Sequence, residues 1–537
     1  MRLPRYRGAP VAVVGNGPVG QTTALLLARW GIPVVLLDQQ PTRRLVGSRS
    51  ICQHRDVLDL WDAVGAGARI AAEGVTWRTA RTYYRGQELF SITLPDPGRS
   101  RFPPFVNISQ SRTEQILDER IAQQPLIDVR WGHRVLDVRQ CGSAVRLRCA
   151  TEAGEVLVQA SYAVLAAGAG AGDLRAALGV GFAGRSFDDR FLICDIRCEL
   201  PGWEQERRFY FDPEWNPGRQ VLIHPTPDSV YRIDWQVPPG FDLVAEERGG
   251  GLETRIRRIV GDRPYQVVWR SVYRFHARLV DRMRVGRVLL AGDCAHLMAP
   301  FGARGLNSGA QDAENAAWKL AFVLHGWAPE TLLDSYHAER HAAARENLEV
   351  TAATMRFLVP HTPAEREHRR RVLERALHDP AARAQVDSGR LAEPFWYVDS
   401  PLTTPDPTRP FPGRPPRGAA PAVVPGVLVP DVPVRLADRP EVCRLREVVR
   451  DGFLALCGTG VDVAAVARVM AEVTAAPSRA LAVDEIDGEG VLLGALGTRP
   501  GETWLVRPDG HLAAVAHGSD QVAVALRRGL GWPEAPG

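Results

Sequence analysis

The sequence contains a single lysine, Lys319, although lysine and arginine together number 66. Nearly all of the positive charge is therefore carried by arginine, and these residues are scattered along the chain. The formal net charge is only +4 over 537 residues. Because nucleic-acid-binding proteins gather their basic residues into a patch or stripe, we expect no nucleic-acid partner.

The eight cysteines include no C-x-x-C pair and no set with the spacing of zinc ligands. Cys194 and Cys198 share a strand-like run, where we expect core positions rather than a metal site. We therefore expect reduced thiols, no bound metal and a cytoplasmic location. The sequence also lacks an apolar run long enough to cross a membrane and a stretch that resembles a signal peptide, so we expect no membrane partner.

The stretch from Val11 to Asp38 predicts a strand, a tight turn, a helix and a second strand that ends at an acidic residue. A short β-branched run, Val11 to Val14, is typical of a buried parallel strand. A helix follows from about Gln21 to Trp30, and Val34 to Leu37 form the second strand. This order is that of a βαβ unit, which places the turn and the acidic residue at one edge of a sheet.

Three glycines, Gly15, Gly17 and Gly20, form the pattern G-x-G-x-x-G in that turn. Gly15 permits the turn, Gly17 lets the backbone approach a pyrophosphate, and Gly20 lets the helix pack against the strand. Free N–H groups at the helix start favour the phosphates, and Asp38 can accept hydrogen bonds from ribose hydroxyls. The pattern predicts a dinucleotide site without distinguishing FAD from NAD(P). A glycine turn that binds nothing is the alternative.

A second glycine-rich stretch runs from Arg287 to Gly326. It predicts a strand at Val288 to Ala291, a strand end at Gly292 and Asp293, and then a loop. Asn307 or Ser308 can cap a helix that continues to about Leu324. A carboxylate at the strand end and donors at the helix start both suit a flavin, whose reduced ring carries negative charge.

Residues 180–280 are mostly strand-like and rich in aromatic residues. Such a sheet can enclose an apolar pocket, although most of its aromatic side chains are expected to face the core. Four members are also able to form polar contacts with a substrate: Tyr210, His224, Arg232 and Trp235.

The chain as a whole predicts an α/β fold with five successive regions. They are an FAD-binding domain at 1–180 with strand insertions from about 75–110, a substrate-binding β-sheet domain at 181–280, a second FAD-binding segment with a helical cover at 281–395, a Pro-rich linker at 396–440 and a small α/β domain at 441–537.

These motifs together resemble the FAD-dependent aromatic hydroxylases, the single-component flavoprotein monooxygenases, including 3-(3-hydroxyphenyl)propionate hydroxylase-like and polyketide hydroxylase-like members. The resemblance covers roughly residues 8–360 well and the tail more loosely. It implies a Rossmann-type FAD-binding domain, an inserted mixed-sheet substrate domain and a thioredoxin-like C-terminal domain. That tail has no C-x-x-C pair, so dimer contact or structural support is its expected role.

The resemblance also implies which residues contact FAD. The segment GSRSICQHRDVLDLWDAVG carries Arg49, ISQSRTEQIL carries Gln110, and GDCAHLMAPFGARGLNSGAQDAENAAWKL places Asp293 at the ribityl chain. No protein catalytic residue is assigned, and the loop with Pro300 and Gly302 is expected to shape the reacting face of the flavin. The full set implied for the cofactor is Gly15, Gly17, Pro18, Gly20, Asp38, Arg49, Gln110, Val135, Asp293, Pro300, Gly305, Leu306 and Asn307.

For such a family the resemblance implies hydroxylation of a phenolic or polycyclic aromatic, polyketide-like substrate by dioxygen, through a flavin C4a-hydroperoxide, with NADPH or NADH as reductant. One motif departs from the family pattern: Gly168 stands where an aspartate is expected, Ala169 stands in place of the following glycine, and Asp173 is displaced by five residues. This departure bears on the use of NAD(P)H more than on FAD.

Several alternatives therefore remain. A flavoprotein oxidase, dehydrogenase or isomerase acting on a similar substrate needs no NAD(P)H. A flavin-binding partner protein without turnover belongs to a different class. A halogenase of this fold is disfavoured because the only lysine, Lys319, lies in the flavin-side helix and W-x-W-x-I-P is absent. An NAD dehydrogenase is disfavoured because the stretch around Asp293 would have no role in it.

Overall fold

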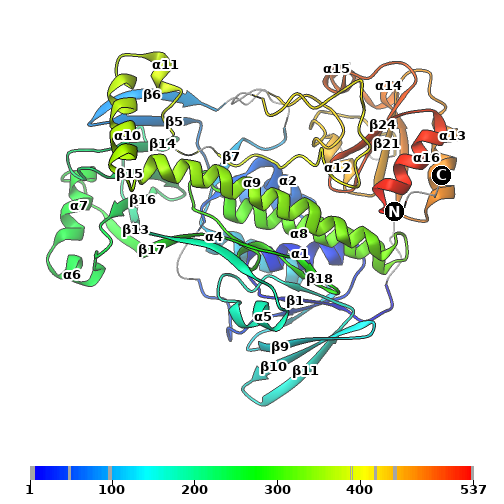
Figure 1. Cartoon of the computed structure of the whole chain (residues 1–537), viewed down its shortest axis with the longest axis horizontal. Coiled ribbons are helices and arrows are strands. Elements are labelled where there is room, and N and C mark those ends of the chain that lie inside the picture. The colour runs from blue at the N-terminus through cyan, green and yellow to red at the C-terminus, as the bar shows by residue number, and fades with distance from the viewer. Residues whose placement is uncertain are drawn as a thin grey trace.

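The computed structural model describes residues 6–45, 50–94, 100–387, 389, 391–415, 420–438 and 444–533. Arg49 lies outside these residues, so its expected contact with FAD stays a prediction. Figure 1 shows two long central helices, α8 and α9, with an extended sheet region at one end and a smaller C-terminal unit at the other.

The first sheet has six strands in the order β18-β19-β12-β1-β2-β8. Strand β1 pairs in parallel with both β12 and β2, and all of its residues are buried. The strands are β1 Val11–Val14, β2 Val34–Leu37, β8 Ile127–Arg130, β12 Tyr162–Leu165, β18 Arg284–Val285 and β19 Val288–Leu290.

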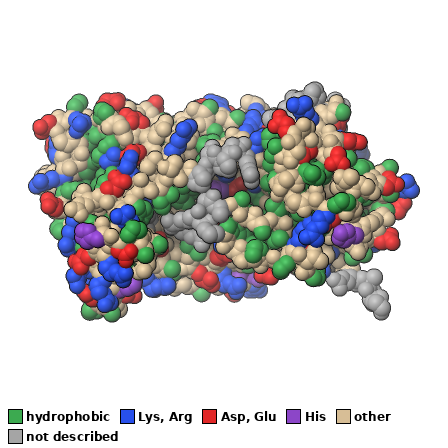
Figure 2. Space-filling view, turned by 90° about the horizontal axis from the view of Figure 1, so that it is seen from above, with side chains coloured by type: hydrophobic (Ala, Val, Ile, Leu, Met, Phe, Trp, Pro, Cys, Tyr) green, Lys and Arg blue, Asp and Glu red, His purple; other side chains and the backbone are tan. Residues whose placement is uncertain are grey.

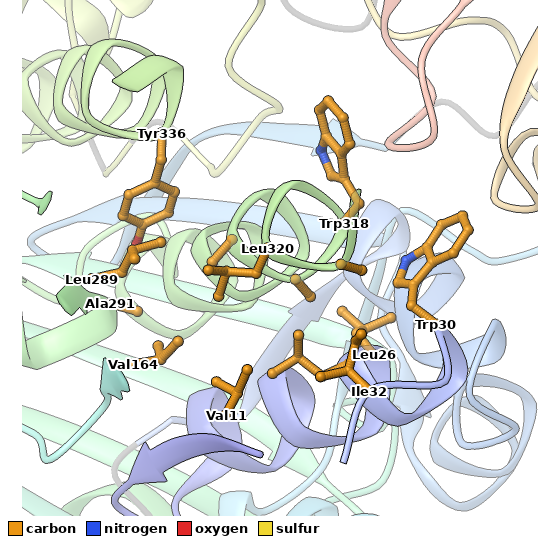
Figure 3. Packing of buried hydrophobic residues seen from close by; sticks show 14 of the residues in the cluster. Val11, Leu26, Trp30, Ile32, Val164, Leu289, Ala291, Trp318, Leu320 and Tyr336 are labelled. Atoms are coloured by element: carbon orange, nitrogen blue, oxygen red, sulfur yellow. The ribbon is translucent and has the colours of Figure 1, made fainter. Parts of the chain in front are cut away.

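Helix α1 (Pro18–Arg29) packs against α8 (Arg304–Leu324), and α4 (Gln110–Ala122) lies on its other side. Helix α9 (Asp334–Leu358) adds Tyr336, whose hydroxyl donates a hydrogen bond to the carbonyl oxygen of Leu290 at 2.7 Å. Dense apolar packing of this kind fixes the strand ends that carry the glycine loop. Figure 3 shows part of this core: Val11, Leu26, Trp30, Ile32, Val164, Leu289, Ala291, Trp318, Leu320 and Tyr336.

The largest sheet has eight strands in the order β20-β17-β13-β16-β15-β14-β5-β6. Strands from outside residues 181–280 form both edges of this sheet. Strand β20 pairs with β17 at one edge, and a hairpin around Arg85 and Gly86 adds β5 and β6 beside β14 at the other. The strands are β5 Thr79–Tyr84, β6 Gln87–Thr93, β13 Phe182–Arg197, β14 Glu206–Phe211, β15 Gln220–Thr226, β16 Val230–Val237, β17 Gln266–Val280 and β20 His296–Leu297.

Two further sheets have three strands each, in the orders β11-β10-β9 and β3-β7-β4. Their strands are β3 Cys52–His54, β4 Val75–Thr76, β7 Phe105–Asn107, β9 Arg134–Cys141, β10 Ala144–Thr151 and β11 Gly154–Ala160. The remaining helices before the tail are α2 Arg55–Asp62, α3 Gly67–Glu73, α5 Gly172–Ala177, α6 Leu243–Arg248, α7 Gly251–Val260, α10 Pro363–Ala376 and α11 Pro380–Arg383, with short 3-10 turns η1 Gly292–Cys294 and η2 Glu330–Leu333.

The C-terminal unit has a four-stranded sheet in the order β22-β21-β23-β24, with β21 parallel to β22 and antiparallel to β23. Its elements are α12 Leu445–Val449, β21 Phe453–Cys457, α13 Val463–Val473, β22 Ser478–Ala482, α14 Val483–Ile486, α15 Val491–Leu496, β23 Glu502–Val506, β24 Leu512–His517 and α16 Gly518–Gly529. Within the described part of 396–438 the chain forms no helix and no strand longer than an isolated bridge, as at Leu428 and Pro433.

Two boundaries differ from the sequence-based expectation. Helix α1 begins at Pro18, three residues before Gln21, because proline is well suited to a first helical position. Helix α8 begins at Arg304, so the prediction that Asn307 or Ser308 caps it is wrong. Its cap residue is Ala303, in a left-handed conformation with φ of 58°.

Acidic and basic side chains are interspersed on the face of the molecule seen in Figure 2. Among the residues that the structure describes, no helix combines the length and the apolar character needed to cross a bilayer. The same residues hold no group of three potential metal ligands, and the seven described cysteines are all free thiols.

Candidate active site

One cavity of about 690 Å³ extends from the end of β1 to the face of the eight-stranded sheet. The glycine loop and Asp38 line its first part, and the segment from Ala291 to Leu306 borders its middle. Strands β13, β14, β15, β16 and β17 form the far end. A single space therefore joins the predicted nucleotide site to the predicted substrate sheet.

The three glycines differ in what surrounds them. Gly15 has φ of +104°, in the region that favours glycine, and a Cβ there would lie 2.4 Å from the carbonyl oxygen of Ala166. A Cβ at Gly20 would lie 1.8 Å from the carbonyl oxygen of Gly15. At Gly17 no atom lies within 4 Å of such a Cβ, and the residue borders the cavity. Gly15 and Gly20 thus shape the turn, whereas Gly17 leaves room for a ligand.

Asp38 organises the loop from its position at the end of β2. Its carboxylate accepts hydrogen bonds from the backbone N–H of Asn16 at 2.7 Å and of Gln40 at 2.8 Å. Arg43 holds the same loop by donating to the side-chain oxygen of Asn16 at 2.9 Å and to Asp118 at 2.6 Å. The carboxylate is therefore held at the edge of the cavity, where an adenosine ribose would lie in a dinucleotide fold.

The segment around Asp293 is held by a buried carboxylate on α8. Asp312 accepts hydrogen bonds from the N–H of Gly292 at 2.9 Å and from Arg340 at 2.7 Å, and its other contact is His296 at 2.7 Å. Burial raises the pKa of Asp312, but His296 and Arg340 outweigh that effect and keep it below its usual value. Asp293 itself borders the cavity.

The loop before α8 meets the middle of the cavity as expected at Pro300, Gly302, Gly305 and Leu306. Asn307 does not border this cavity. Its side chain accepts a hydrogen bond from the N–H of His54 at 2.9 Å and donates one to the carbonyl oxygen of Cys52 at 3.0 Å. Asn307 thereby ties α8 to β3, and its expected contact with FAD stays a prediction.

Gln110 and Val135 both line the cavity, as does Pro18 at the start of α1. The amide of Gln110 donates a hydrogen bond to Glu114 at 2.9 Å. Gly20 lies beneath the loop and outside the cavity lining, consistent with the packing role given to it.

Of the four expected substrate residues, the structure brings His224 and Arg232 to the cavity and leaves Tyr210 and Trp235 outside it. Tyr210 stacks on Tyr83 with ring centroids 4.7 Å apart. Trp235 is fully buried in the apolar layer on the opposite side of β16. Neighbouring strand residues point to opposite faces of a sheet, so Trp235 and Arg232 cannot both face the same cavity.

Sequence reasoning missed several residues at the far end of the cavity. Arg232 forms a bidentate ion pair with Asp195 on β13, at 2.7 and 2.8 Å. The period-two pattern from Arg232 would have indicated Asp234 on the same face. The further members come from neighbouring strands whose register the sequence does not reveal: Phe191, Ile193, Arg207, Leu222, Tyr273 and Phe275.

Two ionisable groups in this end of the cavity have strongly shifted pKa values. Burial lowers the pKa of His224 well below its usual value, and Arg207 and Arg232 lower it further, so the ring is neutral. Burial raises the pKa of Asp234 to about 7, an effect that Arg232 and Arg207 oppose and Asp195 strengthens.

The site fits FAD. The open space at Gly17, the carboxylate of Asp38 and the cavity that continues past Asp293 to the glycine-rich loop accommodate an extended dinucleotide whose ring reaches the substrate sheet. The mixed α/β fold and this cavity are those of an FAD-binding protein.

Comparison with known proteins agrees with that class. Residues 8–351 match a protein-family model described as an FAD binding domain. A flavin-dependent monooxygenase of Mycobacteroides abscessus is 33% identical over 354 residues, which cover 62% of this chain and 71% of that protein. The chain therefore belongs to the family of FAD-binding monooxygenases and is an FAD-dependent oxidoreductase of the aromatic hydroxylase type.

Two further relatives differ in how much of their length is matched. A 3-(3-hydroxy-phenyl)propionate/3-hydroxycinnamic acid hydroxylase of Comamonas testosteroni is 30% identical over 66% of this chain, but the match spans 60% of that enzyme, less than two thirds of its length. A 6-methylpretetramide 4-monooxygenase of Streptomyces rimosus is 28% identical over 98% of this chain and 94% of that enzyme.

Solved structures share the fold along nearly the whole chain. The flavin-dependent monooxygenase PieE, solved with FAD and substrate, superposes with a TM-score of 0.85 at 23% identity, covering 98% of this chain and 99% of that one. Aklavinone-11 hydroxylase, solved with FAD and aklavinone, gives 0.78 at 24% identity, covering 98% and 100%.

Proposed function

We propose that this protein hydroxylates a phenolic or polycyclic aromatic, polyketide-like substrate, using dioxygen and FAD with NAD(P)H as the reductant. The observation that carries the proposal is the continuous cavity from Gly17 to the eight-stranded sheet. Its far end combines aromatic side chains with a few buried polar groups, as sites for ring-shaped ligands do. The full-length match to a monooxygenase of a polycyclic substrate supports the substrate class.

Bound FAD would supply electron transfer and the activation of oxygen. The chain's own residues bind and orient the two ligands. Gly17 and the start of α1 would receive the pyrophosphate, Asp38 the adenosine ribose, and Asp293 the ribityl chain. The loop from Pro300 to Leu306 would lie against the ring, and a ring-shaped substrate packed on the apolar side chains of the far end would displace water from the reacting atoms.

The use of NAD(P)H as the reductant is a separate part of this proposal. Gly168 borders the cavity in place of the family aspartate, with φ of +71° and no atom within 4 Å of the place that a Cβ would take. Asp173 borders the same cavity from α5 and is exposed, so a carboxylate remains at this edge. An oxidase, dehydrogenase or isomerase that needs no NAD(P)H is the second candidate, because Gly168 itself offers no side chain to a nicotinamide.

Anaerobic reduction of the bound flavin separates the two candidates. The purified yellow protein is mixed with NADPH or NADH, with and without a panel of phenolic compounds, and the flavin absorbance band is followed. We expect a phenolic ligand to accelerate bleaching. Flavin that neither nicotinamide reduces under any ligand would contradict the proposal and favour the second candidate.

The proposal also includes a role for the C-terminal unit, residues 441–537. The C-terminal unit, with a mixed four-stranded sheet and helices α13 and α16, is consistent with a thioredoxin-like domain. We propose a structural or dimer-forming role for it, because Cys457 is buried and no described cysteine pairs with it.

A further inference from the structure

The far end of the cavity contains a row of charged and polar residues across adjacent strands. His224 on β15 lies directly opposite Arg232 on β16, and Arg232 lies opposite Asp195 on β13. Side chains at directly paired positions share a face of the sheet. The bidentate contact between Arg232 and Asp195 satisfies both groups within this row.

Asp234 stands apart from that row. It lies two residues further along β16, and its paired neighbours are Leu222 on β15 and Ile193 on β13. Both neighbours are apolar and both border the cavity. A carboxyl group between two aliphatic side chains receives no compensating contact from its own row, which is costly unless something else provides one.

Two polar atoms at this place have no hydrogen-bond partner among the described residues. They are Oδ1 of Asp234 and Nδ1 of His224. Both residues are half-buried and both line the cavity. Native proteins satisfy nearly all buried polar atoms, so an unpaired carboxylate oxygen and an unpaired ring nitrogen bordering one cavity indicate a ligand that completes them.

We propose that Asp234 is a catalytic residue that accepts the proton of a ring hydroxyl on the substrate, and that His224 provides a second hydrogen bond at the same end of the ring. The inference rests on the proposed function and specifies its substrate: an aromatic compound with a free hydroxyl group. The substrate O–H bond breaks, its proton forms a bond with a carboxylate oxygen of Asp234, and the electron pair stays on the ring oxygen. An ionised ring oxygen makes the ring a stronger nucleophile toward an electrophilic oxygen.

The surrounding charges support this direction of proton transfer. Arg207 on β14 and Arg232 on β16 favour negative charge at the site, whereas the negative charge of Asp195 on β13 opposes it. His224 is neutral and Tyr273 on β17 lines the same space. Because burial sets the pKa of Asp234 at about 7, the carboxylate is half ionised near neutral pH and can both take and release a proton.

Binding of a simple phenol tests the proposal without requiring turnover. The probe is 2-naphthol, which keeps its own proton through neutral pH, and its matched control is 2-methoxynaphthalene, which has no hydroxyl proton. Equilibrium dialysis against the FAD-loaded full chain gives the dissociation constants. For wild type we expect the affinity for 2-naphthol to rise as pH passes from about 6 to about 8, because Asp234 ionises, while the methyl ether shows no such rise.

The variant Asp234→Asn removes the charge at nearly constant shape. We expect 2-naphthol to bind it about tenfold more weakly at pH 8 and without the rise with pH, as loss of a hydrogen bond to a charged group predicts. The control Asp228→Asn changes an exposed carboxylate in the turn of the same hairpin, at a left-handed position that asparagine tolerates. It should bind 2-naphthol like wild type.

Three results would overturn the inference: equal affinity in wild type and Asp234→Asn, an identical rise for the methyl ether, or no binding of 2-naphthol at any pH. The wild-type comparison of the two ligands stands even if the variant folds poorly. The flavin reduction assay reports separately on the proposed function. If ligands still stimulate flavin reduction while Asp234→Asn binds 2-naphthol like wild type, the proposed function stands and only this inference is overturned.

Discussion

Gly17 and Gly20 occupy the same motif but differ in what a methyl group would meet. At Gly20 a Cβ would collide with the carbonyl oxygen of Gly15 at 1.8 Å, inside the packed contact between α1 and the turn. At Gly17 it would enter the cavity without touching any protein atom. Neither glycine has a positive φ that a side chain would strain, so the space alone decides the effect.

We therefore expect Gly17→Ala to lower the affinity for FAD while leaving the stability of the apoprotein within about 0.5 kcal/mol of wild type. Gly20→Ala should destabilise the apoprotein itself by about 2 kcal/mol, because the helix must move away from the loop. Urea unfolding of apoprotein and titration with FAD measure the two effects.

Gly240→Ala serves as a control for both variants, since its Cβ would also meet no atom within 4 Å, its φ is ordinary, and it is exposed and outside the cavity lining. Should Gly17→Ala retain full FAD affinity, the pyrophosphate does not pass over this residue. Should Gly20→Ala unfold like wild type, the turn is looser than its geometry indicates.

At the residue scale, the sequence predicted the residues that belong to a local motif. It missed the cavity residues whose position depends on how the strands pair. His224 and Arg232 were predicted at the cavity and lie there, but Tyr210 and Trp235 were chosen by residue type alone and lie outside it. Asp234 was missed although it is adjacent to Trp235. Which of two neighbouring strand residues faces a cavity depends on the pairing of strands far apart in the sequence, and a single sequence does not contain that information.

At the scale of elements, helix α8 holds the chain segment that precedes it in place. Asp312 on this helix receives the N–H of Gly292, the ring of His296 and the guanidinium of Arg340 on α9. All of these side chains are buried. The strand end with Asp293 is thereby attached to two helices.

Asp312→Asn should destabilise the protein by about 3 kcal/mol at pH 7, because Arg340 and His296 would be left buried without their carboxylate. The pKa of Asp312 is lowered in the folded state, so its contribution is fully present above the ordinary carboxyl pKa of about 4 and is lost as the pH falls further. The difference between wild type and variant should therefore shrink in acid.

Urea unfolding at neutral and acid pH measures this dependence. Asp334→Asn, which removes an exposed carboxylate from the start of α9, is the control and should change stability by less than about 1 kcal/mol. A variant Asp312→Asn as stable as wild type at pH 7 would show that Gly292 is held by other contacts.

Elements with a strong local pattern were predicted well, among them β1 and β2. The start of α8 was not, because the sequence offers Asn307 and Ser308 as conventional caps. Ala303 adopts a left-handed φ of 58° that alanine rarely takes. Contacts of Arg304 with Asn347 at 2.5 Å and with the carbonyl oxygen of Leu391 at 3.1 Å help hold this turn, and these partners lie far away in the sequence.

In the whole molecule, the C-terminal unit is joined to the FAD-binding part through ion pairs, of which those of Arg446 and Arg450 are largely buried. Arg450 contacts Asp59 on α2 at 3.1 Å and Glu314 on α8 at 2.9 Å. Arg446 pairs with Asp56 on α2, and Arg29 on α1 pairs with Asp451 at 2.8 Å. The C-terminal unit therefore contacts α1, α2 and α8, the helices that carry or support the cofactor loops.

This arrangement makes the stability of the two units interdependent, because a buried charge that loses its partner is costly. Arg450→Ala should destabilise the docked state by about 3 kcal/mol, because Glu314 loses its guanidinium partner and Asp59 keeps only its 3.7 Å contact with Arg446. We expect faster proteolysis between residues 396 and 440 and separate unfolding transitions for the two units.

Arg479→Ala removes an ion pair with Asp438 on the surface of the same unit and should leave one transition, since exposed pairs contribute little. A single cooperative transition in Arg450→Ala, at the wild-type midpoint, would show that apolar contacts alone hold the C-terminal unit in place.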